Sequence, residues 1–118
     1  MSKRQKILIL ENDDFLREII GTQLHKKGGY LLTAFSITEG IEEARGHHID
    51  TIILGTSCPE YKGKETLDYI KKQLEQHDIN FYMINHENKA LDFVDPLHQM
   101  KTEELSIKEI VSSIPTEA

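Results

Sequence analysis

The clearest pattern along the chain is an alternation of short, almost wholly apolar runs with longer segments in which apolar residues recur every three or four positions. Runs without polar alternation are typical of strands covered on both faces, and the longer spacing is typical of amphipathic helices. The short runs are ILIL (7–10), YLLTAF (30–35), TIIL (51–54), FYMI (81–84) and LDFV (91–94). We therefore predict five strands.

Helical spacing follows most of these runs. The predicted helices cover residues 15–27, about 37–45 and about 64–75, and a last helix begins at 102–104. Ser36 and Glu39 have the spacing of a capping box at the start of the second helix. Asp13 or Asp14 is expected to cap the first helix and to complement its dipole.

Strands that alternate with helices indicate an α/β fold, in which right-handed crossovers join parallel strands and helices cover both faces of the sheet. One connection departs from this pattern. Between the fourth and fifth predicted strands only NHENKA (85–90) remains, and a crossover that contains a helix needs about 10–12 residues. We expect this helix to be missing or very short. Residues 1–114 then form one domain, with PTEA (115–118) as a tail or the start of a linker.

Composition narrows the function classes. The net charge of -6 argues against nucleic-acid binding by this domain, since such binding depends on Lys and Arg. No apolar run is long enough to span a bilayer, so we expect no membrane association. A single cysteine, Cys58, excludes an internal disulfide and fits a reducing, cytoplasmic location.

Candidate chemistry lies at the strand ends, because ligands of such sheets bind beyond the carboxyl ends of the strands. The residues there are Glu11, Asn12, Asp13 and Asp14 after the first strand, Gly55, Thr56 and Ser57 after the third, Asn85 and His86 after the fourth, and Asp95 and Pro96 after the fifth.

Three segments carry a resemblance to a known family. They are KILILENDDFLREII (6–20), DTIILGTSCPEYKGKETLDYIK (50–71) and LDFVDPL (91–97). The chain resembles the receiver domain of bacterial two-component response regulators. The resemblance extends over nearly the full length of the chain, and these three segments carry it. The resemblance implies a flavodoxin-like, doubly wound, five-stranded parallel sheet with the strand order 2-1-3-4-5.

The resemblance also implies a particular chemistry. In that family, a histidine kinase transfers a phosphoryl group to an aspartate at the end of the third strand. An acidic pair after the first strand holds Mg²⁺, while a Ser or Thr after the fourth strand and a Lys before a proline in the fifth contact the phosphoryl group. A carboxylate nucleophile, a hard cation and a fixed positive charge are thus all required.

This sequence departs from the family at each of those positions. Gly55 stands at the acceptor position, and Glu11 with Asn12 replaces the acidic pair. Asn85 stands at the Ser/Thr position, and Asp95 before Pro96 reverses the sign of the expected lysine. The resemblance is therefore to a degenerate pseudo-receiver with a vestigial phosphorylation pocket.

Two local features suggest other chemistry. Glu11 and Asp13 form a weak candidate site for a divalent cation such as Mg²⁺, but Mg²⁺ sites usually need several convergent oxygens, and helix capping explains the acids better. We expect no cofactor. Cys58 has no adjacent Lys or His to lower its pKa, so we expect a packed residue and not a redox thiol.

The leading hypothesis is a non-enzymatic, phosphorylation-independent interaction module of bacterial signalling, with a protein or an output domain as its partner. One alternative is a flavodoxin-like protein that binds a small ligand or a divalent metal. Flavin or nucleotide phosphate is disfavoured because the acidic loop after the first strand would repel it. A second alternative is a conventional phosphorelay receiver with a displaced acceptor, Asp50 or Glu60.

Overall fold

A computed structural model describes residues 4–86, 91–95, 98–102 and 106–117. Its elements, in chain order, are β1 (Lys6–Leu10), α1 (Asp14–Lys26), β2 (Tyr30–Ala34), α2 (Ile37–Ala44), β3 (Thr51–Gly55), α3 (Lys64–Leu74), β4 (Asn80–Asn85), β5 (Gln99–Lys101) and α4 (Ile107–Ser112). The strands form one parallel sheet in the order β2-β1-β3-β4-β5. The predicted flavodoxin-like α/β fold is confirmed.

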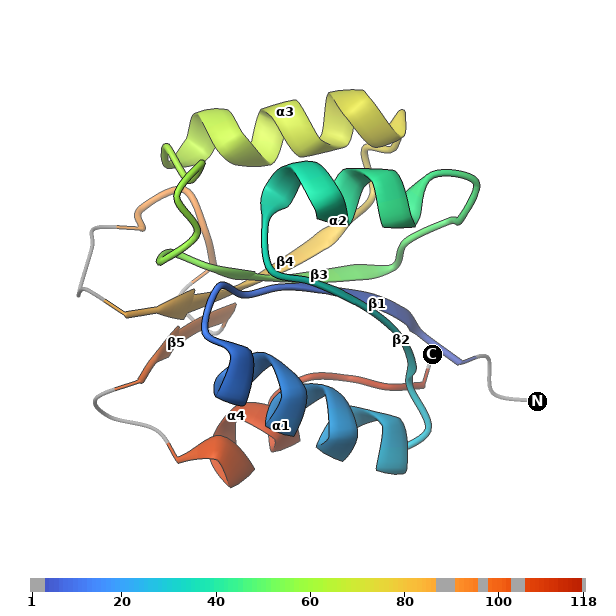
Figure 1. The fold of residues 1–118 in the computed structure, drawn as a ribbon, viewed down its shortest axis with the longest axis vertical. Helices are drawn as coiled ribbons and strands as arrows, with labels where there is room; N and C mark the ends of the chain where they lie inside the picture. The colour runs from blue at the N-terminus through green and yellow to red at the C-terminus, as the bar shows by residue number, and fades with distance from the viewer. Residues whose placement is uncertain (1–3, 87–90, 96–97, 103–105, 118) are drawn as a thin grey trace.

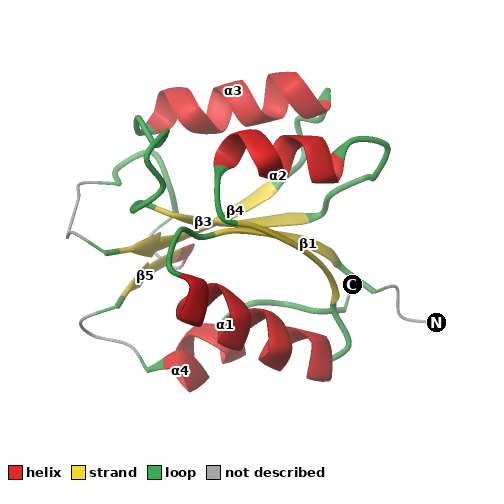
Figure 2. Ribbon diagram, in the orientation of Figure 1, coloured by secondary structure: helices red, strands yellow, loops and turns green. Residues whose placement is uncertain are grey.

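Helices cover both faces of this sheet. Helices α2 and α3 lie on one face, and α1 and α4 lie on the other (Figures 1 and 2). Leu8 and Leu10 belong to the apolar cluster on the α2 and α3 side, whereas Ile7 and Ile9 belong to the cluster on the α1 and α4 side. All four side chains are fully buried, which is why β1 contains no polar alternation.

The predicted helix starts are observed for the first two helices. The side chain of Asp13 accepts a hydrogen bond from Leu16 N–H (2.9 Å) and caps α1. The side chain of Ser36 accepts from Glu39 N–H (3.1 Å) and caps α2. In both cases a short polar side chain satisfies a backbone donor that the helix itself leaves unpaired.

The fifth strand is not LDFV, and this prediction was wrong. β5 is Gln99–Lys101, paired with β4 so that Gln99 lies opposite Met83 and Lys101 opposite Asn85. Residues 91–95 form a turn whose Leu91 is buried in the cluster on the α2 and α3 side. The prediction followed apolar content, but a three-residue edge strand can have a single buried side chain, here Met100.

The connection from β4 to β5 covers residues 86–98 and is longer than expected. Its described part (86, 91–95 and 98) contains no α-helix, in agreement with the prediction, whereas 87–90 and 96–97 lie outside the described residues. The last helix begins at Ile107 and not at 102–104. Ser106 and Glu109 form the capping box that starts it, and residues 103–104 lie outside the described part of the chain.

Residues 115–117, which the sequence suggested as a tail or the start of a linker, lie against the domain. Thr116 is buried, its carbonyl accepts from Gln5 N–H (2.9 Å), and Glu117 forms an antiparallel bridge with Arg4. Among the described residues, no helix has the length and apolar character needed to cross a membrane.

Candidate functional site

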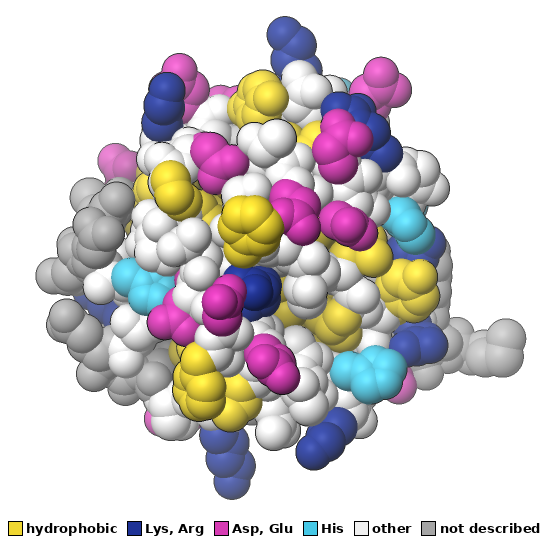
Figure 3. Space-filling model, in the orientation of Figure 1, with side chains coloured by type: hydrophobic (Ala, Val, Ile, Leu, Met, Phe, Trp, Pro, Cys, Tyr) yellow, Lys and Arg dark blue, Asp and Glu magenta, His cyan; other side chains and the backbone are white. Residues whose placement is uncertain are grey.

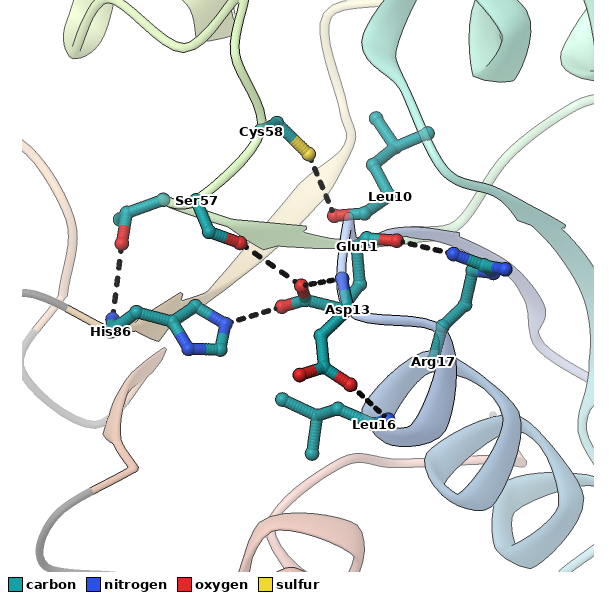
Figure 4. A network of polar contacts seen from close by, with 9 residues as sticks. Leu10, Glu11, Asp13, Leu16, Arg17, Ser57, Cys58 and His86 are labelled. Atoms are coloured by element: carbon teal, nitrogen blue, oxygen red, sulfur yellow. Dashed lines mark hydrogen bonds and ion pairs between the residues drawn. The ribbon is translucent and has the colours of Figure 1, made fainter.

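The loops that follow β1, β3 and β4 meet at one edge of the sheet, since parallel strands end on the same side. They bring Glu11, Ser57 and His86 together in one polar network (Figure 4). Glu11 directly follows β1, Gly55 is the last residue of β3, and His86 directly follows β4. The predicted position of the pocket is therefore the place where these side chains meet.

Glu11 is the centre of this network and is fully buried. Its Oε2 accepts hydrogen bonds from Asp13 N–H (2.8 Å) and from Ser57 Oγ (3.1 Å). Its Oε1 lies 2.6 Å from His86 Nε2. A buried carboxylate is costly unless donors surround it, and these three contacts supply that compensation.

Gly55 lies directly beneath the Glu11 carboxylate. A Cβ atom built on Gly55 would collide with Glu11 Oε1 and would lie 2.9 Å from Glu11 Cδ. Real Cβ atoms essentially never approach other heavy atoms so closely. The glutamate therefore occupies the space that any side chain at position 55 would need.

His86 lies at the end of a predicted strand, but the sequence analysis gave it no role in the site. Its backbone N–H donates to Thr56 Oγ1 (3.0 Å), while its ring reaches Glu11, so it connects the loops after β1, β3 and β4. The Nε2 to Oε1 distance of 2.6 Å makes this a short, close contact between the ring and the carboxyl group. The signal in the sequence that could have indicated a role for His86 was its position directly after a predicted strand.

The weak metal candidate is not supported by the positions of its residues. The Asp13 carboxylate caps α1 and the Glu11 carboxylate is held by three donors, whereas Asn12 is exposed. Arg17 donates to the Glu11 carbonyl (2.8 Å) and pairs with Asp14 (2.7 Å), which fixes the loop further. Within the described residues, no group of three or more His, Cys, Asp or Glu could hold a metal ion.

The prediction that Asp95 stands in place of a lysine at the end of the fifth strand is wrong. Asp95 is exposed and precedes β5, so it does not replace a lysine at the end of that strand. Lys101 ends β5, in register with Asn85, which is almost fully buried at the end of β4. A lysine is therefore present at the end of the fifth strand, seven residues after the end of the predicted strand (91–94).

Cys58 is buried and donates weakly to the Leu10 carbonyl (3.5 Å). Burial, together with the negative charges of Glu11 and Glu60, raises the pKa of the Cys58 thiol to about 12. A thiol that stays protonated at neutral pH is a poor nucleophile. This agrees with the expectation of a packed residue.

The two displaced acceptor candidates lie elsewhere. Asp50 precedes β3, at the amino end of the sheet, where its Oδ2 accepts from Lys6 N–H (2.8 Å). Glu60 accepts from Ile37 N–H (3.2 Å) and from the N–H and hydroxyl of Thr38 (3.1 and 3.0 Å), so it binds the start of α2.

Comparison with solved structures identifies the class of fold. The CheY-like response regulator receiver domain protein of Methanospirillum hungatei JF-1 has a TM-score of 0.73 at 14% identity, over 93% of this chain and 90% of that chain. Chemotaxis protein CheY4 of Vibrio cholerae has a TM-score of 0.73 at 15% identity, over 94% and 96%. A receiver domain of Clostridium thermocellum has 0.69 at 20% identity, over 92% and 90%.

These similarities establish a receiver-like fold over nearly the whole chain. No family model matches the sequence. The chemistry of the carboxyl edge therefore has to be argued from the residues of this chain, above all from Glu11, Gly55 and His86.

Proposed function

We propose that this chain is an atypical receiver domain that acts as a phosphorylation-independent protein-interaction module in two-component or phosphorelay signalling. The observation that carries the proposal is the Glu11 carboxylate, which lies over Gly55 and is paired with His86. In a phosphorylatable receiver this space would belong to an aspartate and its phosphoryl group. Here a contact within the chain, between Glu11 and His86, takes their place.

The absence of a nucleophile supports this proposal. β3 ends in Gly55, and the next residues offer only hydroxyls: Thr56 Oγ1 accepts from His86 N–H, and Ser57 Oγ donates to Glu11. A serine nucleophile requires a base at its hydroxyl. The base at Ser57 Oγ is the Glu11 carboxylate, which is already held by Asp13 N–H and by the ring of His86. We therefore also propose that the domain is not an enzyme and needs no cofactor.

Charge supports the same conclusion. A phosphoryl group carries about -1.5 to -2 charge, and here it would meet the buried Glu11 carboxylate at the centre of the site. Lys101 offers a positive charge near Asn85, but a lysine without an acceptor or a metal site does not restore the transfer. A ligand at this edge would also have to displace the His86 contact, which argues against the small-ligand alternative.

The displaced-acceptor alternative has less support. Asp50 lies at the opposite end of its strand, and Glu60 makes three hydrogen bonds to the start of α2. The proposed partner is a protein or an output domain, not nucleic acid or membrane. Exposed aromatic side chains near the carboxyl edge, Phe15 (68% exposed) and Phe35 (51%), offer apolar contact area for such a partner.

The test is treatment with acetyl phosphate and Mg²⁺, read by intact-protein mass spectrometry. The chain should gain no phosphoryl group, and beryllium fluoride should leave the NMR signals of Gly55, Asn85 and Lys101 in place. Stoichiometric phosphorylation would contradict the proposal, and mapping to Asp50 or Glu60 would establish the displaced acceptor.

A reconstituted variant provides the positive control. Gly55→Asp alone should remain unphosphorylated, because Glu11 fills the space of the new carboxylate and repels it. Glu11→Asp, Asn12→Asp and Gly55→Asp together shorten the blocking side chain and add the acceptor and a metal ligand, with Lys101 already present. This triple variant should accept phosphate, and phosphorylation of the single variant would show that Glu11 does not block the site.

The interaction itself can be tested by affinity capture from the native cell extract. A specific partner should be retained equally with and without acetyl phosphate, and Phe15→Ser should reduce its yield. Capture that depends on acetyl phosphate would contradict phosphorylation independence.

A further inference from the structure

β2 forms one edge of the sheet and, in the described part of the chain, pairs with β1 alone. Edge strands of native proteins usually carry a charge, a proline or a bulge that prevents pairing with another chain. β2 has the sequence YLLTA and an unbroken register with β1, so it has none of these protections.

The hydrogen-bond pattern shows which backbone groups face outward. Tyr30 N–H donates to the Gln5 carbonyl (3.0 Å), and the Ala34 carbonyl accepts from Glu11 N–H (3.2 Å). In a parallel ladder alternate residues face the same neighbour, so Tyr30, Leu32 and Ala34 all face β1. The N–H and C=O groups of Leu31 and Thr33 therefore point away from the sheet.

A groove of about 660 Å³ runs beside this edge, between β2 and α1. Its lining includes Leu31 and Thr33 of β2 and, on α1, the small Gly21 and Thr22 beside the larger Arg17, Glu18 and His25. Tyr30 is 40% exposed at the amino end of the edge. Figure 3 shows this face, with hydrophobic side chains gathered between α2 and α1.

The charges along the edge have opposite signs at its two ends. At the amino end, Lys6 and Arg4 lie over the Tyr30 ring, with Nζ and Cζ at 5.6 and 5.8 Å from its centroid. Beyond the carboxyl end, the first turn of α2 contains Glu39, whereas Asp14 in the first turn of α1 is paired with Arg17 (2.7 Å). The edge is therefore cationic where the strand begins and anionic where it ends.

We propose that β2 pairs antiparallel with β2 of a second copy of this chain, about a two-fold axis at Leu32. Leu31 of each copy then lies opposite Thr33 of the other, and these two pairs exchange four backbone hydrogen bonds. The two-fold axis also places the cationic end of each edge beside the anionic end of the other.

This self-complementarity selects a second copy over an unrelated peptide, because a two-fold interface needs the same surface to fit itself. The result is a dimer with one continuous sheet. The inference goes beyond the proposed function and does not depend on it, since the outward backbone groups of Leu31 and Thr33 take no part in the contact between Glu11 and His86.

The test is sedimentation velocity of the full chain from micromolar to millimolar concentration. The chain should dimerise reversibly. Thr33→Pro removes an outward N–H from each copy, and thus two of the four hydrogen bonds, so it should weaken dimerisation at least about tenfold. Thr33→Ala keeps the N–H and should stay within about twofold of the unchanged chain. Circular dichroism should show that both variants are folded, because Thr33 N–H is not part of the ladder with β1.

Charge reversal provides a second, independent measurement. Lys6→Glu and Glu39→Lys should each weaken the dimer, and the double variant should recover most of the loss. This result decides the question if Thr33→Pro does not fold. A chain that is monomeric at every concentration overturns the proposal. Equal affinity of folded Thr33→Pro and Thr33→Ala, or a double variant weaker than both single ones, overturns it as well.

Discussion

At the scale of single residues, Gly55 and Glu11 are two parts of one arrangement. The glycine leaves a space at the end of β3, and the glutamate that follows β1 fills it with a buried carboxylate. Because three donors hold that carboxylate, it cannot move aside without losing their hydrogen bonds. A substitution at either residue should therefore disturb the packing or the hydrogen bonds of the other.

Gly55→Ala should destabilise the fold by about 1–3 kcal/mol, the usual cost of overpacking a buried site. The added Cβ would collide with Glu11 Oε1, while the backbone of Gly55 needs no conformation that alanine cannot adopt. Urea denaturation measures the free energy of unfolding.

Gly21→Ala is the matched control for that substitution. Gly21 is buried in α1, but a Cβ there would meet its nearest neighbours, Ile9 Cδ1 and Thr33 Cγ2, at 3.6 and 3.7 Å, which is ordinary contact. Alanine should stabilise this helix by about 0.5–1 kcal/mol. Equal effects of the two alanines would show that Glu11 does not fill the space over Gly55.

At the scale of elements, the start of α2 is held by two loops. Ser36, which directly precedes α2, caps the helix. Glu60, in the loop after β3, accepts hydrogen bonds from backbone N–H groups of its first turn. Burial raises the pKa of Glu60, but the hydrogen bonds from Thr38 and Ile37 outweigh this effect, so its pKa lies below the ordinary value of 4.5. The ionised form is therefore the one that the folded state favours.

Glu60→Gln should destabilise the fold by about 1 kcal/mol at neutral pH, as expected for the loss of a charged group at a helix N-terminus. A lowered folded pKa means that this stabilisation is present above pH 4.5 and is lost as the pH falls through the folded pKa. The difference from the unchanged chain should thus shrink in acid. Thermal unfolding from pH 3 to pH 7 measures it.

Glu43→Gln is the control for Glu60, because Glu43 is an exposed acid in α2 itself. It should change the free energy of unfolding by less than about 0.5 kcal/mol at any pH. If the two variants behave alike, Glu60 does not hold the helix start.

At the scale of the whole molecule, described residues from the two terminal segments lie together, as in the bridge between Arg4 and Glu117. Thr116 accepts from Gln5 N–H and donates to the Lys27 carbonyl (3.1 Å), and Lys27 Nζ donates to the carbonyls of Val111 and Ile114 (2.9 and 3.2 Å). These contacts join the C-terminal segment to β1 and to the end of α1. They imply that residues 115–117 contribute to the stability of the domain.

Removal of residues 115–118 should lower the free energy of unfolding by about 1–3 kcal/mol, since it deletes two hydrogen bonds and the buried Thr116 side chain. Thr116→Val, which keeps the bulk and removes only the hydroxyl, should account for about a third to a half of the loss. An unchanged unfolding midpoint would show that the segment is a tail.

The sequence alone determined the parallel sheet, its strand order through the resemblance, the N-caps of α1 and α2, and the position of Gly55 at the edge of the sheet. These features follow from local periodicity, capping chemistry and segment order, all of which are read along the chain. The contact between Glu11 and His86 was not visible, because it joins residues 75 positions apart through side chains whose directions depend on packing.

Tertiary structure also decided the position of the fifth strand. LDFV is more apolar than QMK, and periodicity favours the more apolar run. Only pairing with β4 selects Gln99–Lys101 as the edge strand, while Leu91 and Val94 are buried without forming one. Burial depends on where a segment lies against the sheet, whereas apolar content depends only on the segment itself. For this reason the sequence placed the fifth strand too early. The charged residue found at the end of that strand is Lys101 and not Asp95.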